Sequence, residues 1–96
     1  MFSVEVLPDA EAEIGEAFLW YRERSPMAAE AFRDEVFAAI DRLATDALVW
    51  PEDENAFRRY NLRHFPYKVC YEVQGTTVTV LAVAHHRRRP GYWQSR

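Results

Sequence analysis

Apolar residues recur along this chain first at the spacing of a strand, then at that of two helices, then again at that of strands. Every second position from Phe2 to Val6 is apolar, which is typical of a short strand. Apolar side chains three and four apart over residues 10–24 and 26–45 predict two amphipathic helices. From residue 57 the period of two returns. It predicts three further strands, over residues 57–64, 67–73 and 78–85.

Two local signals set the helix starts. Pro8 ends the first strand, and Asp9 is a residue type that caps helix N-termini. Ser25 followed by Pro26 is a strong start signal for the second helix. Since no spacer separates the two helices, we expect a hairpin that packs on the sheet. The predicted fold class is α+β: a helical hairpin on a mostly antiparallel four-stranded sheet, in the order β-α-α-β-β-β.

A tight turn around Gly75-Thr76 joins the last two predicted strands. A type II′ hairpin turn there would place residue 73 opposite 78 and residue 71 opposite 80. The helix-facing side would then carry Val69, Tyr71, Val73, Val78, Val80, Ala82 and Ala84. The other side would carry Lys68, Cys70, Glu72, Thr79, Leu81, Val83 and His85. Because this second side is half polar, we expect an open surface there.

Composition limits the class of protein. Ninety-six residues, 49% of them hydrophobic, predict one globular domain over residues 1–96 and exclude a disordered chain. No apolar run is long enough to cross a membrane, and the first residues do not resemble a signal peptide. Cys70 is the single cysteine. We therefore expect a cytoplasmic protein.

Charge is distributed unevenly along the chain. Residues 1–56 carry four arginines and fourteen acids, whereas residues 57–96 carry seven arginines and Lys68 against the single acid Glu72. An asymmetry of this kind indicates a polyanion or an acidic partner for the basic half. The run Arg87-Arg88-Arg89 suits either partner, because the planar guanidinium group binds phosphates and carboxylates through two hydrogen bonds.

Few patterns point to catalysis. No serine stands in a nucleophile motif, and no glycine-rich phosphate loop occurs. His85 and His86 are adjacent, so in a strand they face opposite ways, and we expect neither a metal nor a cofactor. General acid–base cleavage of RNA stays open: Lys68, His85 or His86, Arg88 and Tyr92 could converge at one end of the sheet. The alternative is that these residues are a solvated strand end, packing histidines and a tail closing over the core.

Two segments resemble a known family. They run from Leu62 to Tyr71, with Phe65-Pro66-Tyr67 at the centre, and from Val83 to Trp93, with His85-His86-Arg87-Arg88. Pro8-Asp9-Ala10-Glu11 and Trp20-Tyr21 fit the same family. Together they are similar to the RelE/ParE superfamily, the toxins of bacterial type II toxin–antitoxin systems. The resemblance implies a toxin neutralised by a cognate antitoxin, of the ribbon-helix-helix, ParD-like type.

The two branches of that superfamily imply different targets. ParE-like members inhibit DNA gyrase, which suits the acidic, aromatic hairpin. Target contacts would then be Trp20, Tyr21, Phe37 and Trp93. RelE-like members are ribosome-dependent mRNA endonucleases, and by position their catalytic residues would be Lys68, His86, Arg88 and Tyr92. A histidine replaces a key arginine of that branch and the total charge is acidic, so we favour the ParE branch. The chain is an enzyme only in the RelE branch; a non-toxic binding module is a third alternative.

In either toxin branch the antitoxin would wrap the toxin. Its amphipathic helix and extended segment would lie in apolar grooves. Its acidic side chains would meet basic residues of the sheet half. The expected antitoxin contacts are Arg58, Arg63, Arg87, Arg88 and Arg89.

Overall fold

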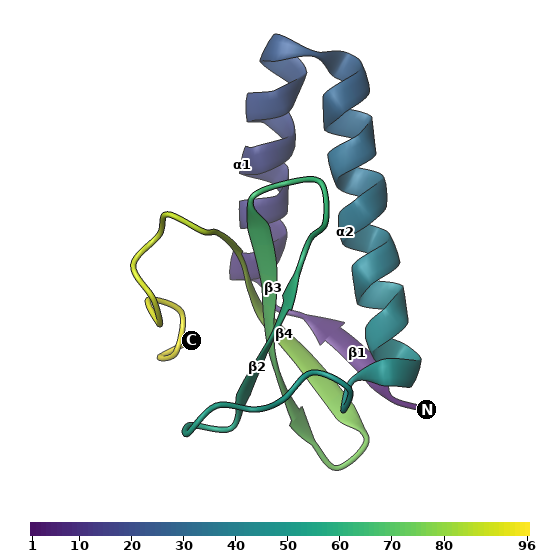
Figure 1. The fold of residues 1–96 in the computed structure, drawn as a ribbon, viewed down its shortest axis with the longest axis vertical. Coiled ribbons are helices and arrows are strands. Elements are labelled where there is room, and N and C mark those ends of the chain that lie inside the picture. The colour runs from purple at the N-terminus through teal and green to yellow at the C-terminus, as the bar shows by residue number, and fades with distance from the viewer.

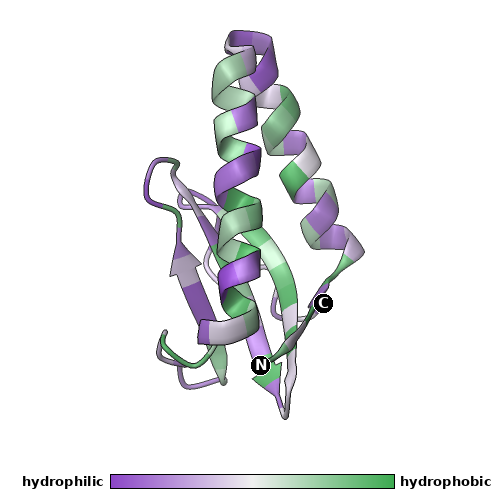
Figure 2. Ribbon diagram, turned by 90° about the vertical axis from the view of Figure 1, so that its right-hand side faces the viewer, coloured by the Kyte–Doolittle hydropathy of each residue, from purple (hydrophilic) through white to green (hydrophobic).

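A hairpin of two helices stands on a four-stranded sheet in the computed structural model, which describes residues 1–96 (Figure 1). The predicted order of elements is confirmed. The elements are β1 (Ser3–Val6), α1 (Pro8–Arg24), α2 (Pro26–Asp46), β2 (Phe57–Asn61), β3 (Tyr67–Gln74) and β4 (Thr77–His85). Hydrophobic and hydrophilic segments alternate along both helices in Figure 2, as amphipathic helices require. None of the helices is long and apolar enough to span a membrane.

The two helix starts differ in how they are capped. Ser25 caps α2 as predicted, since its hydroxyl accepts a hydrogen bond from the Ala28 amide at 3.2 Å. The Asp9 prediction is wrong: α1 begins one residue earlier, at Pro8, and has no side-chain cap. Asp9 lies instead in the first turn, where the helix dipole favours its negative charge.

The sheet is mixed, with the strand order β1-β4-β3-β2. β1 pairs with β4 in parallel, and the other two pairings are antiparallel, so the sheet is mostly antiparallel as predicted. The hairpin register is confirmed, with Val73 opposite Val78 and Tyr71 opposite Val80. Of the two turn residues only Gly75 has a positive φ, +60°, which is the arrangement of a type II′ turn.

A β-bulge in β4 changes the predicted faces of the sheet. Tyr71 lies opposite Val80 but Cys70 lies opposite Ala82, so Leu81 is an extra residue without a partner on β3. The alternation of side chains is therefore inverted beyond Leu81. The face prediction holds as far as Leu81, which lies on the second side with Cys70, and is wrong from Ala82 on, because Val83 joins the core under the helices. Ala82 and Ala84 turn to the other side of the sheet with Cys70.

The core lies between the hairpin and the sheet. Phe32, Val36 and Leu43 of α2 are fully buried there against the valines of β3 and β4. Tyr71 reaches out of the sheet to donate its hydroxyl hydrogen to the Ala47 carbonyl at 2.7 Å, just beyond α2. Burial raises the pKa of this phenol to about 12. The second side of the sheet, predicted to be open, is covered instead. Residues 86–96, called the tail below, cover this side and bury Trp93 against Cys70, Leu81, Ala82 and Ala84.

β2 ends at Asn61, three residues earlier than predicted. The reason is a side chain from the other layer. The Glu35 carboxylate of α2 accepts hydrogen bonds from the backbone amides of Arg63 and His64 at 2.6 and 3.1 Å. These amides are therefore not available to the sheet ladder, and the chain turns away toward Phe65 and Pro66.

We predict a large loss of stability for Phe32→Ala and a small one for Phe37→Ala. Phe32 is fully buried and its ring lies 5.1–5.4 Å from the rings of Tyr21, Phe65 and Tyr67. Its removal should lower the free energy of unfolding by about 3–5 kcal/mol. Phe37, on the same helix, is half exposed, so its removal should cost about 1 kcal/mol or less. Urea unfolding of both variants measures this, and equal losses would contradict the assigned core.

Candidate functional site

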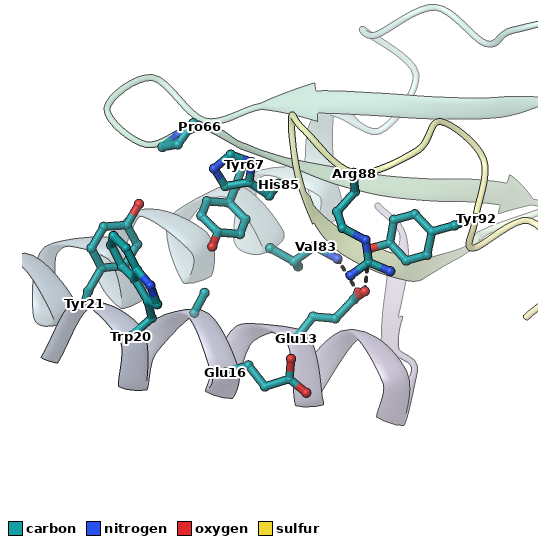
Figure 3. Close-up of a pocket in the computed structure, with 11 residues that line it drawn as sticks. Glu13, Glu16, Trp20, Tyr21, Pro66, Tyr67, Val83, His85, Arg88 and Tyr92 are labelled. Atoms are coloured by element: carbon teal, nitrogen blue, oxygen red, sulfur yellow. Dashed lines mark hydrogen bonds between the residues drawn. The ribbon is translucent and has the colours of Figure 1, made fainter. Parts of the chain in front are cut away.

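A groove of about 500 Å³ lies between α1, the end of the sheet and the tail (Figure 3). Trp20 and Tyr21 of α1 face it from one side, and Glu13 and Glu16 lie one to two turns earlier on the same helix. The opposite wall is formed by Tyr67 and His85 of the sheet and by Arg88 and Tyr92 of the tail. The groove therefore joins three parts of the chain that are far apart in sequence: α1, Pro66 with Tyr67, and residues 83–92 from β4 into the tail.

The groove is mainly aromatic. Burial raises the pKa values of the Tyr21 and Tyr67 phenols, which stay protonated at neutral pH. The His85 ring meets the Tyr67 ring edge-on, 5.0 Å away. Trp20 is 51% exposed, and the Arg24 guanidinium lies over its ring at 3.6 Å. Such a surface can hold an apolar or aromatic side chain of a partner.

Charged groups lie at the tail end of the groove. The Arg88 guanidinium stacks on the Tyr92 ring at 3.9 Å, and the Tyr92 hydroxyl donates to the Glu13 carboxylate at 2.5 Å. Burial and this hydrogen bond raise the pKa of Tyr92, so its phenol stays a donor. Neither Arg88 nor Glu16 has an ion-pair partner, although both line the groove.

The four residues predicted for RNA cleavage do not line one pocket. Arg88 and Tyr92 lie together in the groove, as expected. Lys68 lies opposite Ala84 on the other face of the sheet and does not line the groove. His86 does not line it either; burial lowers its pKa, and the nearby charges of Lys68 and His85 lower it further. His85, the other histidine considered from sequence, is the one that reaches the groove.

The arginines predicted to bind the antitoxin fall into two groups. Arg58 is used within the chain: its guanidinium donates to the carbonyls of Leu48 and Trp50, lies 3.7 Å from the Glu52 carboxylate, and is 14% exposed. It thereby holds the acidic loop before β2. The other four, Arg63, Arg87, Arg88 and Arg89, are exposed and form no ion pair.

Arg63 is presented by a turn that Glu35 fixes. Besides the two backbone amides, the Glu35 carboxylate lies 2.8 Å from Nδ1 of the His64 ring. Burial raises the pKa of Glu35, but the hydrogen bonds from the His64 ring and from the His64 and Arg63 amides outweigh burial and lower it overall. Sequence reasoning missed Glu35 and Glu13. No sequence pattern near either residue indicates its role, because their hydrogen-bond partners lie 28 to 83 residues away.

The residues predicted to contact a target are divided between surface and interior. Trp20 on α1 and Phe37 on α2 are each about half exposed. Tyr21 is partly buried against Phe32 and Phe65. Trp93 is 1% exposed beneath the tail, with its ring edge-on to Phe57 at 4.8 Å. In this structure Trp93 therefore anchors the tail rather than offering a contact surface.

Comparison with known proteins gives one family and one fold. A family model described as the ParE toxin of the type II toxin–antitoxin system parDE matches residues 4–90. Among solved structures, the chain is similar to one titled "Chromosomal ParDE TA system from P. aeruginosa", with a TM-score of 0.78 and 18% sequence identity. The match covers 88% of this chain and 96% of that chain. No curated protein sequence matches.

We predict that Glu35→Gln lowers stability in a pH-dependent way. The pKa of Glu35 is lower in the folded state than the usual 4.5. The carboxylate therefore contributes stability above its unfolded pKa, and this contribution is lost as the pH falls through the folded pKa. At pH 7 the variant should lose about 1–2 kcal/mol, the scale of hydrogen bonds to a charged group.

The difference between wild type and variant should shrink as the pH is lowered below about 4.5. Urea unfolding across a pH series measures it. Asp34→Asn is the matched control, because Asp34 is the neighbouring residue of α2 and its exposed carboxylate makes only an ion pair of 3.9 Å with Arg33. A loss at Glu35 that does not vary with pH would contradict the assignment.

Proposed function

This chain belongs to the ParE toxin family of type II toxin–antitoxin systems, and from that premise we propose that it inhibits DNA gyrase and is neutralised by a ParD-like, ribbon-helix-helix antitoxin. The observation that carries the proposal is the match of the ParE family model over residues 4–90. We place the activity in the cytoplasm, where gyrase acts.

The geometry supports gyrase over the ribosome as the target. A nuclease of the RelE type needs its base, its acid and its phosphate-binding cations around one scissile bond. Lys68 and His86 lie away from the groove that holds Arg88 and Tyr92. The Tyr92 hydroxyl is also bound to Glu13, so it is not free to protonate a leaving oxygen. The acidic total charge is a further disadvantage at a surface of rRNA phosphates.

We assign the gyrase contact to the hairpin. Its tip projects beyond the sheet in Figure 1, where a large partner can reach it. Trp20 and Phe37 offer half-exposed aromatic rings on α1 and α2, and Tyr21 supports Trp20 with an edge-on contact at 5.0 Å. Partly exposed aromatic residues of this kind are typical anchors of protein interfaces. Trp93 would contribute indirectly, by holding the tail.

We assign the antitoxin contact to the groove and the free arginines. The groove offers an apolar, aromatic surface for a helix or an extended segment. Arg63, Arg87, Arg88 and Arg89 are cations without ion pairs, and acidic side chains of an antitoxin would complement them. Arg58 is left out of this contact because its guanidinium already binds the loop before β2.

We predict that the purified chain inhibits DNA supercoiling by gyrase and does not cut mRNA on translating ribosomes. The double variant Lys68→Ala/His86→Ala should keep its gyrase inhibition within about twofold, because neither side chain belongs to the proposed gyrase surface. Supercoiling and ribosomal A-site cleavage assays measure both activities. If the wild-type chain cuts mRNA and the double variant does not, the RelE alternative is supported. Inactivity in both assays would support a binding module instead.

We predict that the triple variant Arg63→Gln/Arg87→Gln/Arg89→Gln binds its cognate antitoxin about tenfold more weakly, ~1.4 kcal/mol. The loss should shrink at high salt, because exposed charges are screened. Titration calorimetry at two salt concentrations measures it. Arg22→Gln is the control, since Arg22 is exposed on the hairpin without an ion pair. Equal affinities of the triple variant and the wild type would contradict the assignment.

A further inference from the structure

Glu13 of α1 binds β4 and the tail at the same time. Its Oε1 accepts a hydrogen bond from the Val83 amide at 3.1 Å, and its Oε2 accepts one from the Tyr92 hydroxyl. The Arg96 guanidinium donates to both oxygens, at 2.9 and 3.1 Å. The Glu13 side chain is only 12% exposed. A carboxylate with so many donors at so little exposure holds its partners in fixed positions.

Arg96, in the tail, binds other groups besides Glu13. It also donates to the Leu81 carbonyl at 3.0 Å and lies 3.5 Å from the Asp9 carboxylate. The hydrogen bond to Glu13 raises the pKa of the Arg96 guanidinium, despite partial burial. The end of the tail is therefore tied both to α1 and to the backbone of β4.

These side chains close a free strand edge. β1 pairs with β4 only as far as Val80, so no strand lies beside the backbone groups that follow. Glu13 supplies the missing acceptor for the Val83 amide, and Arg96 supplies a donor for the Leu81 carbonyl. An exposed edge with unpaired backbone groups is a site for unwanted strand pairing, which these two side chains prevent.

We propose that Glu13 is a positioning residue that fixes the tail and thereby forms the tail wall of the groove. Tyr92 is held by Glu13 directly, and Arg88 is held through its stacking on the Tyr92 ring. Trp93 supplies the apolar anchor of the tail on the sheet. The functional part of this inference rests on the proposed antitoxin contact of Arg88.

Glu13→Gln tests the positioning role, because glutamine keeps the length of the side chain but removes its charge. Three backbone amides report on the tail. The amides of Gln94 and Arg96 donate hydrogen bonds to carbonyls within the tail, and the Val83 amide donates to Glu13. Hydrogen exchange followed by NMR on the full chain should show these amides exchanging about tenfold faster in the variant. Core amides of α2 should change by less than about twofold.

Glu16→Gln is the matched control, since Glu16 lies on the same helix and lines the same groove but has no bond to the tail. In the Glu16→Gln variant the tail amides should exchange at the same rate as in the wild type. Arg96→Gln removes the guanidinium bonds to Glu13 without altering α1, and should also loosen the tail. Because Glu13 and Arg96 contact each other, the double variant Glu13→Gln/Arg96→Gln should loosen the tail by less than the sum of the two single changes.

Unchanged exchange of the tail in Glu13→Gln, or an equal effect of Glu16→Gln, would overturn the inference. Antitoxin binding separates this result from the proposed function. A loosened tail with about tenfold weaker antitoxin binding supports both. A loosened tail with unchanged antitoxin binding supports the role of Glu13 and overturns the assignment of Arg88 to the antitoxin contact.

Discussion

The extra residue at Leu81 determines which side chains in the second half of β4 face the helices and which face the tail. It turns Val83 into the core under the helices and places Ala82 and Ala84 beside Cys70 on the other side of the sheet. The side chains of Cys70, Ala82 and Ala84 are small, so a large ring can pack closely against this side of the sheet. The indole of Trp93 packs there, so the bulge helps to determine where the tail lies.

The position of the tail in turn forms the groove. With Trp93 in place, Tyr92 reaches the Glu13 carboxylate of α1, and Arg88 stacks on Tyr92. Trp93 is the one buried residue of the tail and provides its apolar contact with the sheet, whereas the charged contacts fix the geometry of the tail. The basic segment that follows β4 thus forms one wall of the groove.

Local signals made much of the fold predictable from sequence. Ser25-Pro26 and Gly75 act within a few residues of where they stand, and both predictions are confirmed. The bulge was not predictable, because residues 78–84 are nearly all apolar and show no alternation that an extra residue could interrupt. The early end of β2 was missed for a different reason: Glu35 lies 28 residues away from the amide it binds.

The candidate site was predictable in part for the same reasons. Arg88 and Tyr92 follow β4 closely, and their joint presence at the end of the sheet was foreseen. Lys68 was expected to join them, although its position in the strand places it on the other face of the sheet. Glu13 was not foreseen, since its partners Val83, Tyr92 and Arg96 come to it only through the fold.

Under the proposed function, the groove is a preformed surface for the antitoxin, made from three parts of the chain. The measurement that tests this most directly is hydrogen exchange of the full chain with and without its antitoxin. We expect new protection at α1 around Trp20, at β4 around His85 and at the tail around Arg88. Protection confined to α2 around Phe37, which does not line the groove, with the groove residues unchanged, would contradict it.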